Sequence, residues 1–151
     1  MATQEELEVH RRLHESQDKH TYFLLAAVGA CVGFSITQSN QVALGIQQLP
    51  LAIAVIMWGL SFYCGCRYLQ TKQLITHANT EYLKAENGRH PSSGTEPAKI
   101  AVVMFAIRES INSSGTRASR YRTAQFYLFI FAVIFYVFWH VIKMWERTPI
   151  A

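Results

Sequence analysis

Charged side chains are missing from two long stretches of this chain, and their absence is its most informative feature. No Asp, Glu, Lys or Arg occurs between Thr21 and Cys66, and none occurs between Thr123 and Ile142. Charged residues make up 16% of the whole chain, whereas a soluble domain has about 25%. These gaps disfavour a soluble domain and favour a membrane protein.

Other absences narrow the function. The sequence has three cysteines, an odd number that does not suggest a disulfide framework. It has no Gly-rich phosphate loop, no His-Glu-x-x-His motif and no Gly-x-Ser-x-Gly motif, so we expect no enzyme, no cofactor and no metal site. The N-terminus carries Glu5, Glu6 and Glu8 where a secretory signal would be positively charged, which argues against a signal peptide.

The uncharged stretches predict three transmembrane helices. A helix over 123–142 would be about 30 Å long, close to the hydrocarbon thickness of a bilayer. The stretch from 21 to 66 is too long for one span and suits two, at about Tyr22–Ile36 and Leu49–Cys66, with a turn at Thr37–Gln41 between them.

Small residues in the first two spans predict close helix packing. The first span contains Gly29-x-x-x-Gly33, and the second contains Gly59, Ser61 and Gly65. For Gly29 and Gly33 we favour packing against the second span over a contact between subunits.

The polar segment 67–122 predicts a helical hairpin. A first arm, with an apolar face of Leu74, Ala78, Tyr82 and Ala85, continues out of the second span and stops at Asn87-Gly88. A second arm, capped by Ser93 or Thr95, carries the apolar run Ala98–Ile107, and a break is expected at Asn112–Thr116.

The expected fold class is thus an all-α membrane protein. It has an N-terminal amphipathic helix, three transmembrane helices, and a cytoplasmic helical hairpin between the second and third. The expected parts are residues 1–20, 21–66, 67–122, 123–144 and an outer tail, 145–151.

The distribution of Lys and Arg predicts the orientation. Nine of these residues lie in 67–122 and three in the N-terminal segment, but none lies in the turn between the first two spans. Cytoplasmic loops carry such an excess. We therefore expect the N-terminus and the hairpin in the cytoplasm, the C-terminus outside, and Trp139 and Trp145 as anchors at the outer interface. The net charge of +4 and pI near 9.1 favour anionic lipids as partners over polymeric nucleic acid.

Two features of the third span could carry a function. Phe131, Phe135 and Phe138 share a helical face, which indicates packing against lipid or core, or a hydrophobic gate that closes a pore by dewetting. Three spans cannot enclose a pore, so a gate requires a homo-oligomer.

The second feature is the basic run Gly115–Arg122 before the same span. Its simplest interpretation is anchoring to anionic headgroups. The alternative is a phosphate-bearing ligand held by Arg117, Arg120 and Arg122, with backbone amides of Ser113, Ser114 and Gly115 as donors. Arg89, His90 and Arg108 could contribute to such a site if the fold brings them near.

The run WGLSFYCGCRYLQ, then AN-x-x-YLK-x-x-x-GRHP, and the closing WHVIKMW resemble small bacterial three-span membrane proteins. These are similar to the membrane effectors of nucleotide-signalled anti-phage systems of the Hailong type, over about residues 20–145. The resemblance implies an oligomeric channel in the bacterial inner membrane, opened by a nucleotide that a partner enzyme makes. A non-conducting scaffold, which holds a cytosolic protein through Ala98–Ile107, is the alternative. A transporter ranks third, because no span carries an acidic residue.

Overall fold

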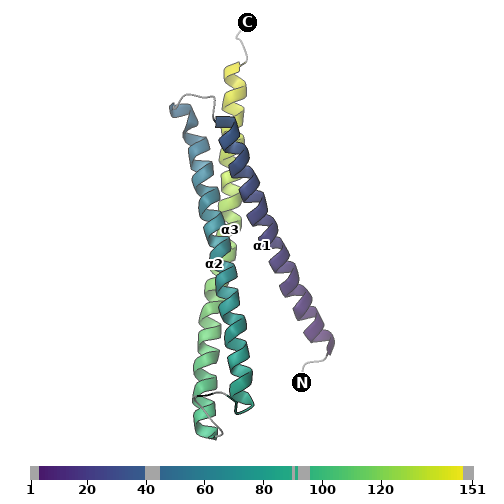
Figure 1. Ribbon diagram of the computed structural model, residues 1–151. Helices are drawn as coiled ribbons and strands as arrows, with labels where there is room; N and C mark the ends of the chain where they lie inside the picture. Colours follow the sequence, from purple (N-terminus) through teal and green to yellow (C-terminus); the bar gives the residue numbers. More distant parts are fainter. Residues whose placement is uncertain (1–3, 40–44, 90, 92–95, 148–151) are drawn as a thin grey trace. The chain divides into compact units, whose positions relative to one another are not determined.

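The computed structural model describes residues 4–39, 45–89, 91 and 96–147, and this part of the chain is helical apart from short turns. The elements are α1 (Gln4–Ser39), a short 3-10 helix η1 (Ile46–Gln48), α2 (Leu49–Glu86) and α3 (Pro97–Arg147) (Figure 1). Helices α1, α2 and α3 each contain a stretch long and apolar enough to cross a membrane. The prediction of an all-α protein with three candidate spans is confirmed.

Several predicted features lie outside the described residues. They are the hairpin tip with His90, the caps Ser93 and Thr95, and the end of the outer tail. Of the turn predicted at Thr37–Gln41, the residues up to Ser39 belong to α1 and the rest is outside the described residues.

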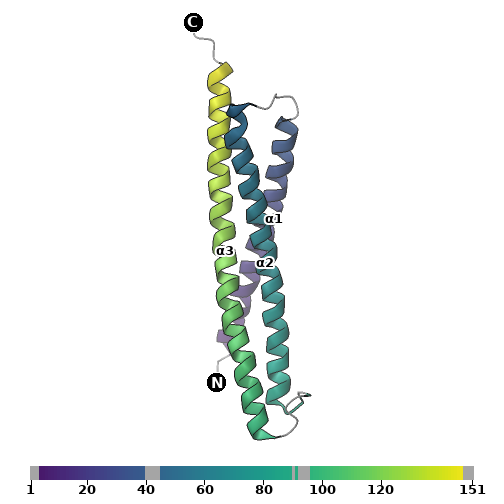
Figure 2. The same ribbon diagram turned by 90° about the vertical axis from the view of Figure 1, so that its left-hand side faces the viewer.

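The described helices belong to two compact units. Unit 1 comprises Met1–Gly65 and Ala124–Ala151, and so contains α1, the first part of α2 and the last part of α3. Unit 2 is Cys66–Thr123, in which the second part of α2 and the first part of α3 run antiparallel and side by side (Figures 1 and 2).

The core of unit 1 follows spacings of three, four and seven residues. On α2 the buried residues are Leu51, Ala54, Trp58, Ser61 and Gly65, and on the unit 1 part of α3 they are Gln125, Ala132 and Trp139. On α1 they are Thr21, Leu24, Val28 and Ser35. Such spacing is typical of helices that pack with knobs in holes, as in left-handed coiled coils.

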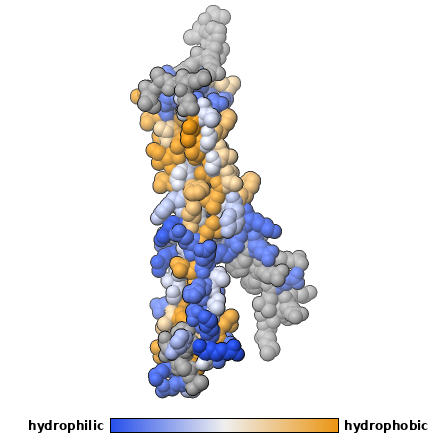
Figure 3. Space-filling model, in the orientation of Figure 1, coloured by the Kyte–Doolittle hydropathy of each residue, from blue (hydrophilic) through white to orange (hydrophobic). Residues whose placement is uncertain are grey.

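The outside of unit 1 is apolar. Large hydrophobic side chains are exposed on all three helices, and the hydrophobic colour of Figure 3 gathers over this unit. Soluble proteins rarely expose contiguous apolar surface of this extent, whereas lipid covers it without cost. The exposed members on α1, α2 and α3 include Tyr22, Phe23, Phe34, Ile56, Leu60, Phe62, Tyr127, Ile134 and Val141.

The small residues of the first two spans divide between the core and the surface. Ser61 and Gly65 are buried, which confirms close packing there. Gly29 and Gly33 are exposed, and a Cβ atom on either would meet nothing within 4 Å. The prediction that they pack against the second span is wrong, because α1 turns its Val28 face to α2 instead.

Trp139 is not an interfacial anchor as predicted. It is buried, and its indole Nε1 donates a 3.0 Å hydrogen bond to Oε1 of Gln48. Close by, Lys143 Nζ donates to Oε1 of Gln47 at 3.5 Å. The two carboxamides of η1, which directly precedes α2, thus bond to Trp139 and Lys143 in the C-terminal part of α3. Trp145 is exposed, as expected of an anchor.

In unit 2, α2 ends where the sequence predicts. Gly88 has a φ of 67°, its N–H donates to the carbonyl of Ala85, and the N–H of Arg89 donates to the carbonyl of Lys84. These two bonds define a Schellman motif, for which glycine is the favoured residue. Of the predicted apolar face, Ala85 is buried and Ala78 and Tyr82 are half-buried, but Leu74 is exposed.

The predicted break at Asn112–Thr116 is absent, because α3 runs uninterrupted from Pro97 to Arg147. The hydroxyls that favour turns are used within the helix. Ser113 Oγ donates to the carbonyl of Ser110, and Thr116 Oγ1 donates to the carbonyl of Asn112. Such back-bonding lets Ser and Thr occupy helix interiors.

Candidate functional site

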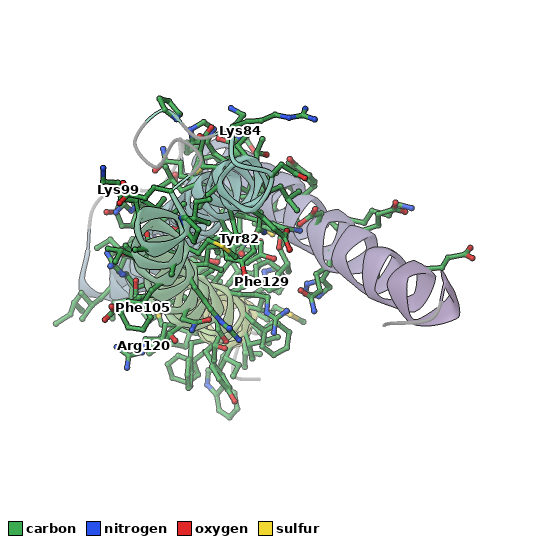
Figure 4. The ribbon with its side chains drawn as sticks, turned by 90° about the horizontal axis from the view of Figure 1, so that it is seen from below. Tyr82, Lys84, Lys99, Phe105, Arg120 and Phe129 are labelled. Atoms are coloured by element: carbon green, nitrogen blue, oxygen red, sulfur yellow. The ribbon has the colours of Figure 1, made fainter. Side chains whose placement is uncertain are left out.

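The basic run of α3 in unit 2 presents two arginines together. Arg117 and Arg120 are exposed, and about 100° of turn per residue places them some 60° apart on the helix. Figure 4 shows Arg120 pointing outward from α3. Within the described residues neither guanidinium has an ion-pair partner. Arg122 is half-buried and turned well away from both.

Arg67 adds a guanidinium that the sequence did not assign to this region. Its Cζ lies 5.8 Å from the ring centroid of Tyr121, which stands between Arg120 and Arg122 in the chain. A cation over an aromatic face at this distance is attracted by the ring quadrupole. The contact joins α2 to the basic run of α3, and only the pairing of the two helices could reveal it.

The other two predicted arginines do not join this group. Arg108 lies about 14 Å along α3 from Arg117 and on the opposite face. It lines a shallow hollow with Phe105, Glu109 and Asn112, where the Glu109 carboxylate disfavours an anion. Arg89 follows the end of α2, about 30 Å along that helix from Arg67.

The backbone donors expected at Ser113, Ser114 and Gly115 are not available. All three residues lie inside α3, where each N–H bonds to a carbonyl of the preceding turn. The prediction that these amides join an anion site is therefore wrong. A phosphate site on this part of the chain would rest on side chains alone.

The three phenylalanines of the predicted gate share a helix face but differ in their surroundings. Phe131 and Phe138 are 49% and 55% exposed, whereas Phe135 packs against the core cluster of unit 1. Phe131 and Phe138 are thus open to lipid or to another copy of the chain. Phe135 already has an intramolecular role.

The core holds two groups that the sequence did not single out. The ring of Tyr136 lies within 6.5 Å, centroid to centroid, of Phe34 on α1, Trp58 on α2, and Trp139 and His140 on α3. Gln125 is fully buried, yet neither atom of its carboxamide has a hydrogen-bond partner in the described part of the chain. One sequence signal existed for Gln125: it is the only carboxamide in the third apolar stretch.

No arrangement of three or more His, Cys, Asp or Glu side chains that could hold a metal ion occurs among the described residues. Comparisons with protein-family models, curated proteins and solved structures find no match to this chain.

Proposed function

We propose that the protein is a homo-oligomeric membrane channel, or pore-forming effector, that is gated from unit 2. In this proposal unit 2 is the cytoplasmic helical hairpin, and a nucleotide made by a partner enzyme binds it during anti-phage defence. The protein lies in the bacterial inner membrane, and the N-terminal part of α1, from Gln4 to about His20, is an amphipathic segment on its cytoplasmic side.

One observation carries the proposal: the basic run and the aromatic span lie on one uninterrupted helix, α3. A ligand moves a gate only if it binds one state better than the other. Phosphate bound at Arg117 and Arg120 would act on the helix that also carries Phe131 and Phe138. A break at 112–116 would have weakened such coupling.

An oligomer is required, because three spans enclose no pore. The open surface at Gly29 and Gly33 supports one, since small exposed residues let helices of neighbouring copies approach closely. The exposed rings of Phe131 and Phe138 could then close a dry constriction between copies.

The gate is tested with Phe138→Ser in liposomes of phosphatidylethanolamine and phosphatidylglycerol. We expect a leak of at least about tenfold in ion flux without any signal, because a hydroxyl wets the constriction. Val137→Ser is the matched control, since Val137 is equally exposed but points about 100° away on α3. Equal, unchanged flux in both variants, with oligomers intact, would place Phe138 against lipid.

The orientation is tested by labelling in intact cells. In a variant whose Cys31, Cys64 and Cys66 are replaced by Ala, an impermeant maleimide should label Ser39→Cys from outside. It should label Asn79→Cys, on the exposed side of α2 in unit 2, only after the cells are opened. The reverse pattern would contradict the orientation predicted from Lys and Arg.

A scaffold without conductance is the alternative, and one observation favours it. Val102 and Phe105 are about 70% exposed on α3 in unit 2, within the predicted docking run Ala98–Ile107; Figure 4 shows Phe105 pointing away from the helix pair. A scaffold predicts no flux in any variant and loss of a bound cytosolic protein from Phe105→Glu.

A further inference from the structure

Gln125 occupies an unfavourable place in the core of unit 1. Its side chain is 0% exposed, and its Nε2 and Oε1 have no hydrogen-bond partner within the described residues. Only its backbone is bonded across the helices: Ser61 Oγ on α2 donates to the carbonyl oxygen of Gln125 at 2.8 Å. A buried amide without a partner loses its solvation and gains nothing in return.

The carboxamide sits against a glycine that gives it room. A Cβ atom on Gly65 of α2 would lie 2.6 Å from Nε2 and 2.9 Å from Cδ of Gln125, and 2.8 Å from Cδ2 of Leu25 on α1. Because Gln125 is enclosed on all sides, it could not swing into lipid to relieve this clash. All three helices of unit 1 therefore meet at this point, and a residue larger than glycine would have to displace the ends of the Gln125 and Leu25 side chains.

The heptad spacing of buried residues on α3 shows that a glutamine is unusual at position 125. One heptad further along α3, the equivalent buried position is Ala132, in a core with Val28, Ala54 and Trp58. An apolar side chain at 125 would suit the same packing without an unpartnered amide. One hydroxyl beside Gln125 could accept from the carboxamide after a small movement: Ser61 is buried, and its Oγ keeps an oxygen lone pair while it donates to the Gln125 carbonyl.

We propose that Gln125, seated against Gly65, is a latch that sets the position of α3 against α1 and α2 at a cost in stability. A second position of α3, in which the carboxamide is hydrogen-bonded, then lies close in free energy. Two discrete arrangements of one packed element are what a switch requires. That the second position is the open state rests on the proposed function; the latch itself does not.

The test compares melting temperatures of the full chain in detergent micelles, followed by circular dichroism. Gln125→Met keeps the length of the side chain and removes both unpartnered atoms, so we expect a rise of about 2–4 °C. Amide hydrogen exchange over 124–139 should slow as the second position is depopulated. A lower melting temperature for Gln125→Met would show that the carboxamide is bonded in the resting state, and would overturn the latch.

A separate test asks whether Gly65 is needed to make room for the carboxamide of Gln125. Gly65→Ala should lower the melting temperature by about 4 °C or more. Gly65→Ala with Gln125→Ala should recover part of the loss, because Nε2 and Cδ of Gln125 are gone and only Cδ2 of Leu25 still lies too close to the new Cβ atom. Gly59→Ala is the matched control, since a Cβ there meets nothing within 4 Å. Equal changes of the melting temperature in Gly65→Ala and Gly59→Ala would show that Gly65 is not needed to make room for Gln125.

Ion flux in liposomes distinguishes failure of the latch from failure of the channel. If both proposals hold, Gln125→Met conducts less than the wild type under the same signal. The expected melting results with no flux in any variant would retain the latch and overturn the channel. Flux in the wild type together with a lower melting temperature of Gln125→Met would retain the channel and overturn the latch.

Discussion

Trp58→Ala should destabilise the helix bundle of unit 1 by at least about 3 kcal/mol. Trp58 is 2% exposed and packs among Val28, Ala54 and Ala132, with the ring of Tyr136 at 5.6 Å. In a bilayer the transfer of apolar surface drives helix association little, so the loss comes from the cavity and the lost packing contacts. Unfolding in mixed micelles by an SDS titration, followed by circular dichroism, measures the change.

Trp145→Ala is the matched control, because it removes the same side chain from a position that is 81% exposed. We expect a change within about 0.5 kcal/mol there. Trp58→Phe should be far milder than Trp58→Ala, since it keeps most of the volume and removes an indole N–H that has no partner in the described residues. Equal destabilisation by Trp58→Ala and Trp145→Ala would mean that Trp58 faces lipid.

Periodicity and turn chemistry predicted much of this fold. The absence of charge located the three apolar helices, and Asn87-Gly88 located the end of α2, because only a few residues tolerate the backbone conformation found at Gly88. The break expected at Asn112–Thr116 failed for a physical reason. Turn propensity is local and weak, and a long helix overrides it when hydroxyls bond back to their own turn.

The faces of the helices were harder to predict than their existence. An interfacial tryptophan and a buried one look alike in sequence. The sequence therefore predicts an interfacial position for Trp139, whereas the indole is buried and bonded to Gln48. The surroundings of Gly29 and Gly33 are hard to predict for a similar reason. Small residues indicate close helix packing, but they do not indicate which helix packs against them. Gln125 and Gly65 are 60 residues apart, and only the packed helices bring them together.

Replacing Arg117 and Arg120 together by Ala should weaken binding of a phosphate-bearing ligand by two or more orders of magnitude. The two exposed guanidiniums stand on neighbouring faces of α3, and each contact with phosphate is worth about 1.5–3 kcal/mol. Because no backbone amide of this helix can assist, little binding should remain. Equilibrium binding of a fluorescent ATP analogue to the purified oligomer, and ion flux with the partner enzyme present, measure the loss.

The double Lys variant decides between a ligand site and a lipid anchor. Lys keeps the charge that headgroups attract but lacks the planar fork that grips phosphate with two bonds. A ligand site therefore predicts that Arg117→Lys with Arg120→Lys binds the analogue poorly while its membrane yield stays normal. Lys99→Ala, which removes a cation already paired with Glu96 at 2.6 Å, should change neither quantity. Wild-type binding and flux in the double Lys variant would show that these arginines serve the headgroups alone.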